Sequence, residues 1–126
     1  MNNQLLKSLA IIACKPLILF YKLLYGNKIK FGKNIIINHR FRIRGKGKLI
    51  IGDNSNLWAR EEPNRFQFYN HEAIITIGNN VRLNGATFQS SKSISIGDDT
   101  IVASAIIADT DFHRFKDPAH ILYGNI

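Results

Sequence analysis

The side chains that could do chemistry gather near the end of the chain, in the run Asp109-Thr110-Asp111-Phe112-His113. In an extended segment alternate residues share a face, so Asp109, Asp111 and His113 would lie together. A carboxylate beside an imidazole raises the basicity of the ring and selects its tautomer, which suits a general base working near neutral pH. A histidine beside two aspartates is, however, more often a surface ion-pair partner. A metal site is not expected, because no further ligand pair follows at a suitable spacing.

The elements that would position this cluster repeat one short pattern four times. The four copies are Ile29-Lys30-Phe31-Gly32, Leu49-Ile50-Ile51-Gly52, Ile75-Thr76-Ile77-Gly78 and Ile94-Ser95-Ile96-Gly97. Each is followed by two polar residues, and successive glycines stand 20, 26 and 19 residues apart. A repeated unit at a nearly constant period predicts stacked coils.

The physical chemistry of the unit supports that interpretation. Two alternating apolar residues point to one face of a short strand, glycine permits a sharp turn, and Asn or Asp tolerates left-handed backbone. Apolar residues recur about every six positions within each coil, which predicts three strands per turn and coils of about 18 residues. A β-sandwich explains the sequence less well, because Asn84-Gly85 alone offers a hairpin signal. We therefore predict an all-β solenoid of hexapeptide repeats.

The N-terminal segment is almost wholly apolar from Leu5 to Tyr25 and predicts an amphipathic helix. Lys15 would lie mid-bilayer in a spanning helix, which disfavours a span. The helix could lie on a membrane surface or cap the open end of the solenoid, and we favour the membrane. The domains expected are a basic helix at 1–27 and a β-helix at 28–126.

Charge is unevenly distributed, because residues 1–52 contain eleven Lys or Arg and no acid. The basic residues of the run 40–48 alternate with apolar residues or glycine, which predicts one cationic face. Such a face could be merely solvated, or could meet an anionic membrane or a phosphate-bearing substrate. Nucleic acid is not expected. The single cysteine, Cys14, fits a reducing compartment and the role of a small apolar residue on the helix.

The second coil is longer than the third by about seven residues, taken from the glycine spacing. We expect the excess to loop out through the stretch from Trp58 to Tyr69. Aromatic and charged residues on such a loop could bind a sugar or pack against a neighbouring subunit. Trp58 is the substrate-binding candidate in this loop.

The repeats, the run from Ile96 to Ala103 and the run from Ile107 to His113 together resemble the bacterial hexapeptide-repeat O-acetyltransferases. The most similar branch acts on sugars in capsule, exopolysaccharide or lipopolysaccharide assembly and is related to the maltose and galactoside acetyltransferases. The resemblance covers about residues 28–120. It implies a left-handed parallel β-helix that works as a homotrimer.

The same resemblance implies an activity and its residues. His113 matches the catalytic base that takes a proton from a sugar hydroxyl, which then attacks the thioester of acetyl-CoA. Asn84 matches an asparagine that helps hold the reacting groups, although a plain corner residue is an equal alternative. Asp109 and Asp111 match acids that bind the acceptor or orient the histidine. The implied partners are a sugar or lipid-linked glycan acceptor and acetyl-CoA as co-substrate, with no metal.

Members of this family continue for several more coils, which hold coenzyme A together with a neighbouring subunit. We therefore expect a β-helix that is incomplete at its C-terminal end, as a truncated or split product or one completed by a partner. The cofactor-binding residues stay unknown. A non-catalytic β-helix subunit and a membrane-surface binding module are the alternatives. The expected location is the cytoplasm, with peripheral contact at the inner face of the membrane.

Overall fold

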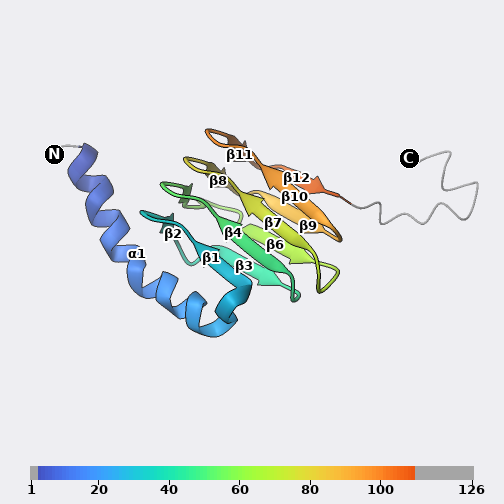
Figure 1. Cartoon of the computed structure of the whole chain (residues 1–126). Helices are drawn as coiled ribbons and strands as arrows, with labels where there is room; N and C mark the ends of the chain where they lie inside the picture. The colour runs from blue at the N-terminus through green and yellow to red at the C-terminus, as the bar shows by residue number, and fades with distance from the viewer. Residues whose placement is uncertain (1–2, 110–126) are drawn as a thin grey trace, which may run out of the picture.

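The structure, a computed structural model, describes residues 3–109. A long helix, α1 (Asn3–Tyr25), passes through a short 3-10 turn, η1 (Gly26–Lys28), into a stack of short strands (Figure 1). The strands are β1 (Ile29–Phe31), β2 (Ile36–Ile37), β3 (Phe41–Arg44), β4 (Lys48–Ile51), β5 (Asn56–Leu57), β6 (Asn64–Phe68), β7 (Ile74–Ile77), β8 (Arg82–Asn84), β9 (Thr87–Ser90), β10 (Ser93–Ile96), β11 (Ile101–Ala103) and β12 (Ile106–Ala108).

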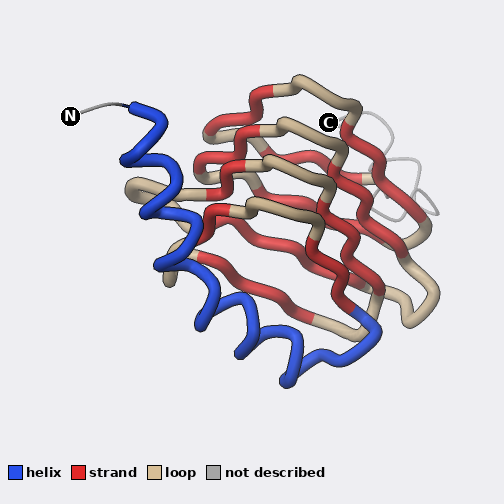
Figure 2. Tube along the Cα trace, turned by 60° about the vertical axis from the view of Figure 1, so that its left-hand side comes forward, coloured by secondary structure: helices blue, strands red, loops and turns tan. Residues whose placement is uncertain are grey.

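The strands form three parallel sheets of four strands each, and every coil contributes one strand to each sheet. The first sheet has the order β1-β4-β7-β10, the second β11-β8-β5-β2 and the third β12-β9-β6-β3. Figure 2 shows the coils stacked along one axis, with the helix beside the first of them. The fold is the expected left-handed parallel β-helix, with about four turns.

The core is a set of columns that run along the stack. In the first sheet Leu49 pairs in register with Ile29 on one side and Ile75 on the other, and Ile94 continues the column. In the third sheet Phe66 and Phe88 are wholly buried, with ring centroids 5.3 Å apart and nearly parallel planes. Like side chains therefore stack on like, because each coil repeats the pattern of the one before it.

The polar pair after each repeat glycine joins one coil to the next. The first polar residue accepts a hydrogen bond from the preceding coil, as when Asp53 Oδ1 accepts from the Lys33 amide at 2.8 Å. The second adopts left-handed backbone, as Asn54 does with φ 60°. Gly52 is required at this corner, because a Cβ there would lie 2.6 Å from the backbone of Gly78. The Gly-polar-polar signature is thus a corner motif.

The inner face of α1 caps the open end of the first coil. Cys14 is buried, and its Sγ donates to the carbonyl oxygen of Ile37 at 3.0 Å. Tyr21 donates its hydroxyl to the carbonyl oxygen of Phe41 at 3.1 Å. Burial raises the pKa of the Tyr21 phenol, and this effect is larger than that of the nearby Arg42 charge, which lowers the pKa. The phenol is therefore neutral and keeps its proton for the carbonyl. Pro16 lies inside this helix, which bends along its course (Figure 1).

Two expectations need correction. The predicted loop from Trp58 to Tyr69 contains strand β6, because Phe66 and Phe68 alternate with polar residues and point inward. The extra length of this coil is divided between two corners, 58–63 and 69–73.

The basic run 40–48 likewise does not form one face. Arg42 and Arg44 lie on the outside of the third sheet, whereas Lys48 begins a strand of the first sheet. The chain turns at Gly45, whose φ is +94°. A Cβ on Gly45 would overlap the carbonyl oxygen of Phe68, so the corner requires glycine.

Candidate functional site

The corner between the second and third sheets brings together two of the sequence-predicted residues. Trp58 follows β5 and Asn84 ends β8, the adjacent strand of the same sheet. Asn84 Oδ1 accepts a hydrogen bond of 2.9 Å from the amide of Arg60, so its Nδ2 is the group that remains to donate to a ligand. The Trp58 side chain is 51% exposed. An exposed indole and an amide donor at the same corner are groups that suit a sugar ring.

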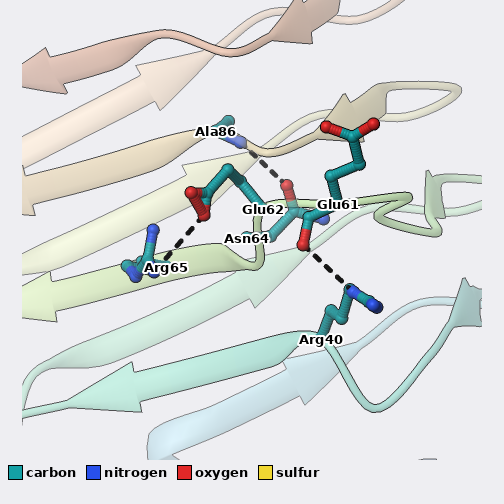
Figure 3. Close-up of polar contacts among 6 residues, drawn as sticks. All are labelled: Arg40, Glu61, Glu62, Asn64, Arg65 and Ala86. Atoms are coloured by element: carbon teal, nitrogen blue, oxygen red, sulfur yellow. Dashed lines mark hydrogen bonds and ion pairs between the residues drawn. The ribbon is translucent and has the colours of Figure 1, made fainter.

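Contacts at its base hold the loop 58–63 against its neighbours (Figure 3). Arg40 donates from Nε to the carbonyl oxygen of Glu61 at 3.1 Å. The Glu62 carboxylate lies 3.9 Å from the Arg65 guanidinium, and both side chains are substantially exposed. An exposed ion pair of this length adds little stability. The hydrogen bond to Glu61 links the loop to the preceding coil. The aromatic and acidic side chains of the loop face solvent.

A buried asparagine that the sequence analysis missed closes this loop. Asn64 is wholly buried and donates from Nδ2 to the carbonyl oxygens of Leu57 and Leu83, at 3.0 and 3.2 Å. Its Oδ1 accepts from the amide of Ala86 at 3.0 Å (Figure 3). Asn38 holds the equivalent corner one coil earlier, with Nδ2 bonded to the carbonyl oxygen of Ala59. The sequence signal that could have identified Asn64 is a polar residue at an inward-facing position of a strand with alternating polarity.

Asp109 lies at the next corner, directly after β12. Its carboxylate accepts hydrogen bonds from the amides of Ser91, Lys92 and Ser93 at 2.6–2.8 Å, and from the Ser90 hydroxyl at 3.0 Å. Burial tends to raise the pKa of this carboxyl, but these hydrogen bonds outweigh burial and lower it. Asp109 is thus held as an anion that orders the corner of the coil below.

The described residues do not bring Asn84 and Asp109 together. Asn84 precedes strand β9 and Asp109 aligns with its far end, where Ser90 lies. At about 3.3 Å per residue, a four-residue strand separates the two corners by about 13 Å. His113 and Asp111 lie outside the described residues, so their positions relative to both corners stay predictions.

A shallow groove of about 310 Å³ lies on the outer face of the third sheet, over strands β3 and β6. It is lined by Arg42, Arg44, Arg65 and Gln67, with the partly buried Ile43 beneath them. Arg42 and Arg65 are register partners in adjacent strands. Guanidinium groups gathered in this way can bind carboxylates or phosphates through paired hydrogen bonds. The pairing of Arg65 with Arg42 was not visible in the sequence, because 22 residues separate them there.

Within residues 3–109 no three His, Cys, Asp or Glu side chains lie close enough together to hold a metal ion. Comparisons with protein families, with curated proteins and with solved structures find no match for this chain.

Proposed function

We propose that this chain is an O-acyltransferase that transfers an acetyl group from acetyl-CoA to a sugar hydroxyl in surface-polysaccharide biosynthesis. The observation that carries the proposal is a hexapeptide-type β-helix whose fourth coil runs into the sequence Asp109-x-Asp111-x-His113. Asp109 is held by four hydrogen bonds, so the segment that contains the histidine starts from an ordered point. The exposed Trp58 and Asn84 give a sugar a ring to stack on and an amide donor.

The chemistry proposed for His113 is general base catalysis. The imidazole takes the proton of a sugar hydroxyl as the hydroxyl oxygen forms a bond to the acetyl carbonyl carbon of acetyl-CoA. The carbon–sulfur bond then breaks, and coenzyme A leaves as the thiol with the proton that the imidazole returns. Backbone amides or a side-chain amide would stabilise the negative oxygen that develops.

The test is transfer of radiolabelled acetyl from acetyl-CoA to a panel of sugars by the full chain, with His113→Ala beside it. His71→Ala is the matched control, because His71 is an exposed histidine in the other enlarged corner. We expect wild type and His71→Ala to transfer acetyl, and His113→Ala to be slower by about a hundredfold or more. Calorimetric titration of acetyl-CoA should give the same binding in all three proteins.

Full activity in His113→Ala would contradict the assigned base. A folded chain that does not bind acetyl-CoA would favour a non-catalytic β-helix subunit or an acceptor-side piece that works with a partner. Homotrimer formation, the cytoplasmic location and the glycan acceptor belong to the same proposal. Sedimentation of the purified chain tests the trimer directly.

A further inference from the structure

The outer face of α1 carries a continuous apolar surface that the solenoid does not cover. The face consists of eight large side chains that are 50% to 78% exposed: Leu5, Leu6, Leu9, Ile12, Leu19, Phe20, Leu23 and Leu24. At about 100° per residue, Leu5 and Leu23 point directly away from the buried Cys14. Isolated exposed apolar residues are ordinary, but a contiguous face of this size on one helix indicates a binding surface.

Lysines border this face on one side. Lys15 and Lys22 lie about a quarter turn from Cys14, between the apolar face and the solenoid. With Lys33 from the first corner they line a groove of about 500 Å³. Its other lining residues include the apolar Ile11, Ile18 and Ile35. The groove therefore offers cationic groups above an apolar floor, which suits a phosphate that carries hydrocarbon.

By length and composition the segment Asn3–Lys28 is apolar enough to cross a membrane. The contacts of its inner face favour a different placement. Cys14, near the middle of the segment, is hydrogen-bonded to the backbone of Ile37, and Tyr21, in the second half, to the backbone of Phe41. A spanning helix would break these bonds or carry the first coil into the bilayer. An orientation parallel to the membrane surface keeps both contacts and buries the apolar face.

A second copy of the chain is a poorer occupant of this face. Residues 1–52 contain eleven basic residues and no acid, so two such helices would bring lysine against lysine. An anionic lipid surface supplies the missing charge, and each Lys or Arg near such a surface contributes about 1 kcal/mol of attraction.

We propose that α1 docks the β-helix on an anionic membrane. The apolar face enters the acyl-chain boundary, and Lys15, Lys22 and Lys33 contact lipid phosphates. The docked orientation places the first coil next to the bilayer, with the later coils stacked away from the helix-covered end (Figure 2). The inference is independent of the acyltransferase proposal, because it uses only the helix and the first coil.

The test is flotation of the full chain with vesicles of equal parts phosphatidylglycerol and phosphatidylcholine, and with vesicles of phosphatidylcholine alone. We expect binding to the anionic vesicles and at least tenfold weaker binding to the neutral ones. The double variant Lys15→Gln/Lys22→Gln should bind anionic vesicles about thirtyfold less tightly. Ile12→Gln/Leu23→Gln should lose binding while keeping its circular dichroism and the protection of Cys14 from a thiol reagent.

The matched control is Arg82→Gln/Lys92→Gln, which removes the same charge from two exposed positions of the third coil. It should bind within about threefold of wild type, because charges more than a Debye length from the surface are screened. Equal losses in this control and in the lysine variant would overturn the proposal, as would equal binding to neutral vesicles. Competition by millimolar inorganic phosphate would indicate a soluble anion site instead. A dimer that Ile12→Gln/Leu23→Gln abolishes, with no vesicle binding, would assign the face to a second copy.

Discussion

Cys14 of the helix and Ile37 of β2 exchange two hydrogen bonds across the open end of the solenoid. The sulfur lies 3.0 Å from the carbonyl oxygen of Ile37 as donor and 3.3 Å from its amide nitrogen as acceptor. The thiol therefore satisfies a backbone edge that would otherwise end the second sheet without a partner. Unpaired strand edges favour unwanted association, so this contact protects the fold as well as holding the helix.

Replacing this sulfur should loosen the cap. Cys14→Ala removes both hydrogen bonds and leaves two buried backbone groups without a partner, which should cost about 1–3 kcal/mol of unfolding free energy. Urea denaturation of the full chain measures the change. Ala13→Ser is the control, because Ala13 is exposed on the same helix and its substitution should cost about 0.5 kcal/mol or less. Equal stability of the two variants would show that the thiol contributes nothing.

Asn64 should be among the most sensitive polar residues of the described chain. Asn64→Leu preserves the approximate volume but leaves two carbonyl groups and the Ala86 amide without their partner. We expect a loss of about 3 kcal/mol or more, since each buried unsatisfied group costs about 1–3 kcal/mol. Asn70→Ala, at an exposed corner position, should cost about 1 kcal/mol at most. Similar urea midpoints of unfolding for the two variants would contradict the structural role assigned to the three hydrogen bonds of Asn64.

Asp109 should make stability depend on acid pH. Burial raises the pKa of its carboxyl, but hydrogen bonds from Ser91, Lys92, Ser90 and Ser93 lower it below its ordinary value. Because the folded pKa is depressed, the stabilisation is complete above pH about 4 and disappears as pH falls through the folded value. The Tm of wild type should exceed that of Asp109→Asn at pH 7, and the difference should shrink toward pH 3. A difference that stays constant with pH would rule out an ionised Asp109 as its source.

Phe88 and Trp58 should separate core packing from ligand binding. Phe88 is wholly buried in the aromatic column, so Phe88→Ala should cost about 3–5 kcal/mol. Trp58 is half-exposed, and Trp58→Ala should cost about 1 kcal/mol or less. Thermal unfolding of both variants tests this contrast. A large loss of stability in Trp58→Ala would assign the indole to packing.

The acceptor role of Trp58 needs a second readout. Trp58→Ala should abolish saturable acceptor binding while the chain keeps its sedimentation mass and its affinity for acetyl-CoA. A fall in mass with acceptor binding retained would place Trp58 at a subunit contact, which is the alternative for an aromatic residue on this loop.

The sequence by itself determined the β-helix, because its signal is local and repeated. Ile75 and Ile77 alternate on one strand, Gly78 turns, and Asn79-Asn80 supply the corner; the same order recurs in every described coil. The end of the helix was equally legible, since Gly26 follows the last apolar turn and adopts φ +59°. Periodicity and corner chemistry are properties of a few adjacent residues, so no tertiary information was needed.

Tertiary structure decided which residues meet and which stay apart. The register between coils places Arg65 beside Arg42. It also brings the Asn64 side chain within hydrogen-bond distance of three backbone groups. The corner at Gly45 divides the basic run between two faces of the solenoid. Tertiary contacts also assign the two faces of the helix, whose composition allowed both a cap on the solenoid and a membrane-binding surface. Cys14 and Tyr21 give one side to the solenoid, and the exposed leucines leave the other side for a partner. The reason is physical: contacts across about 20 residues depend on how coils stack, which local pattern does not encode.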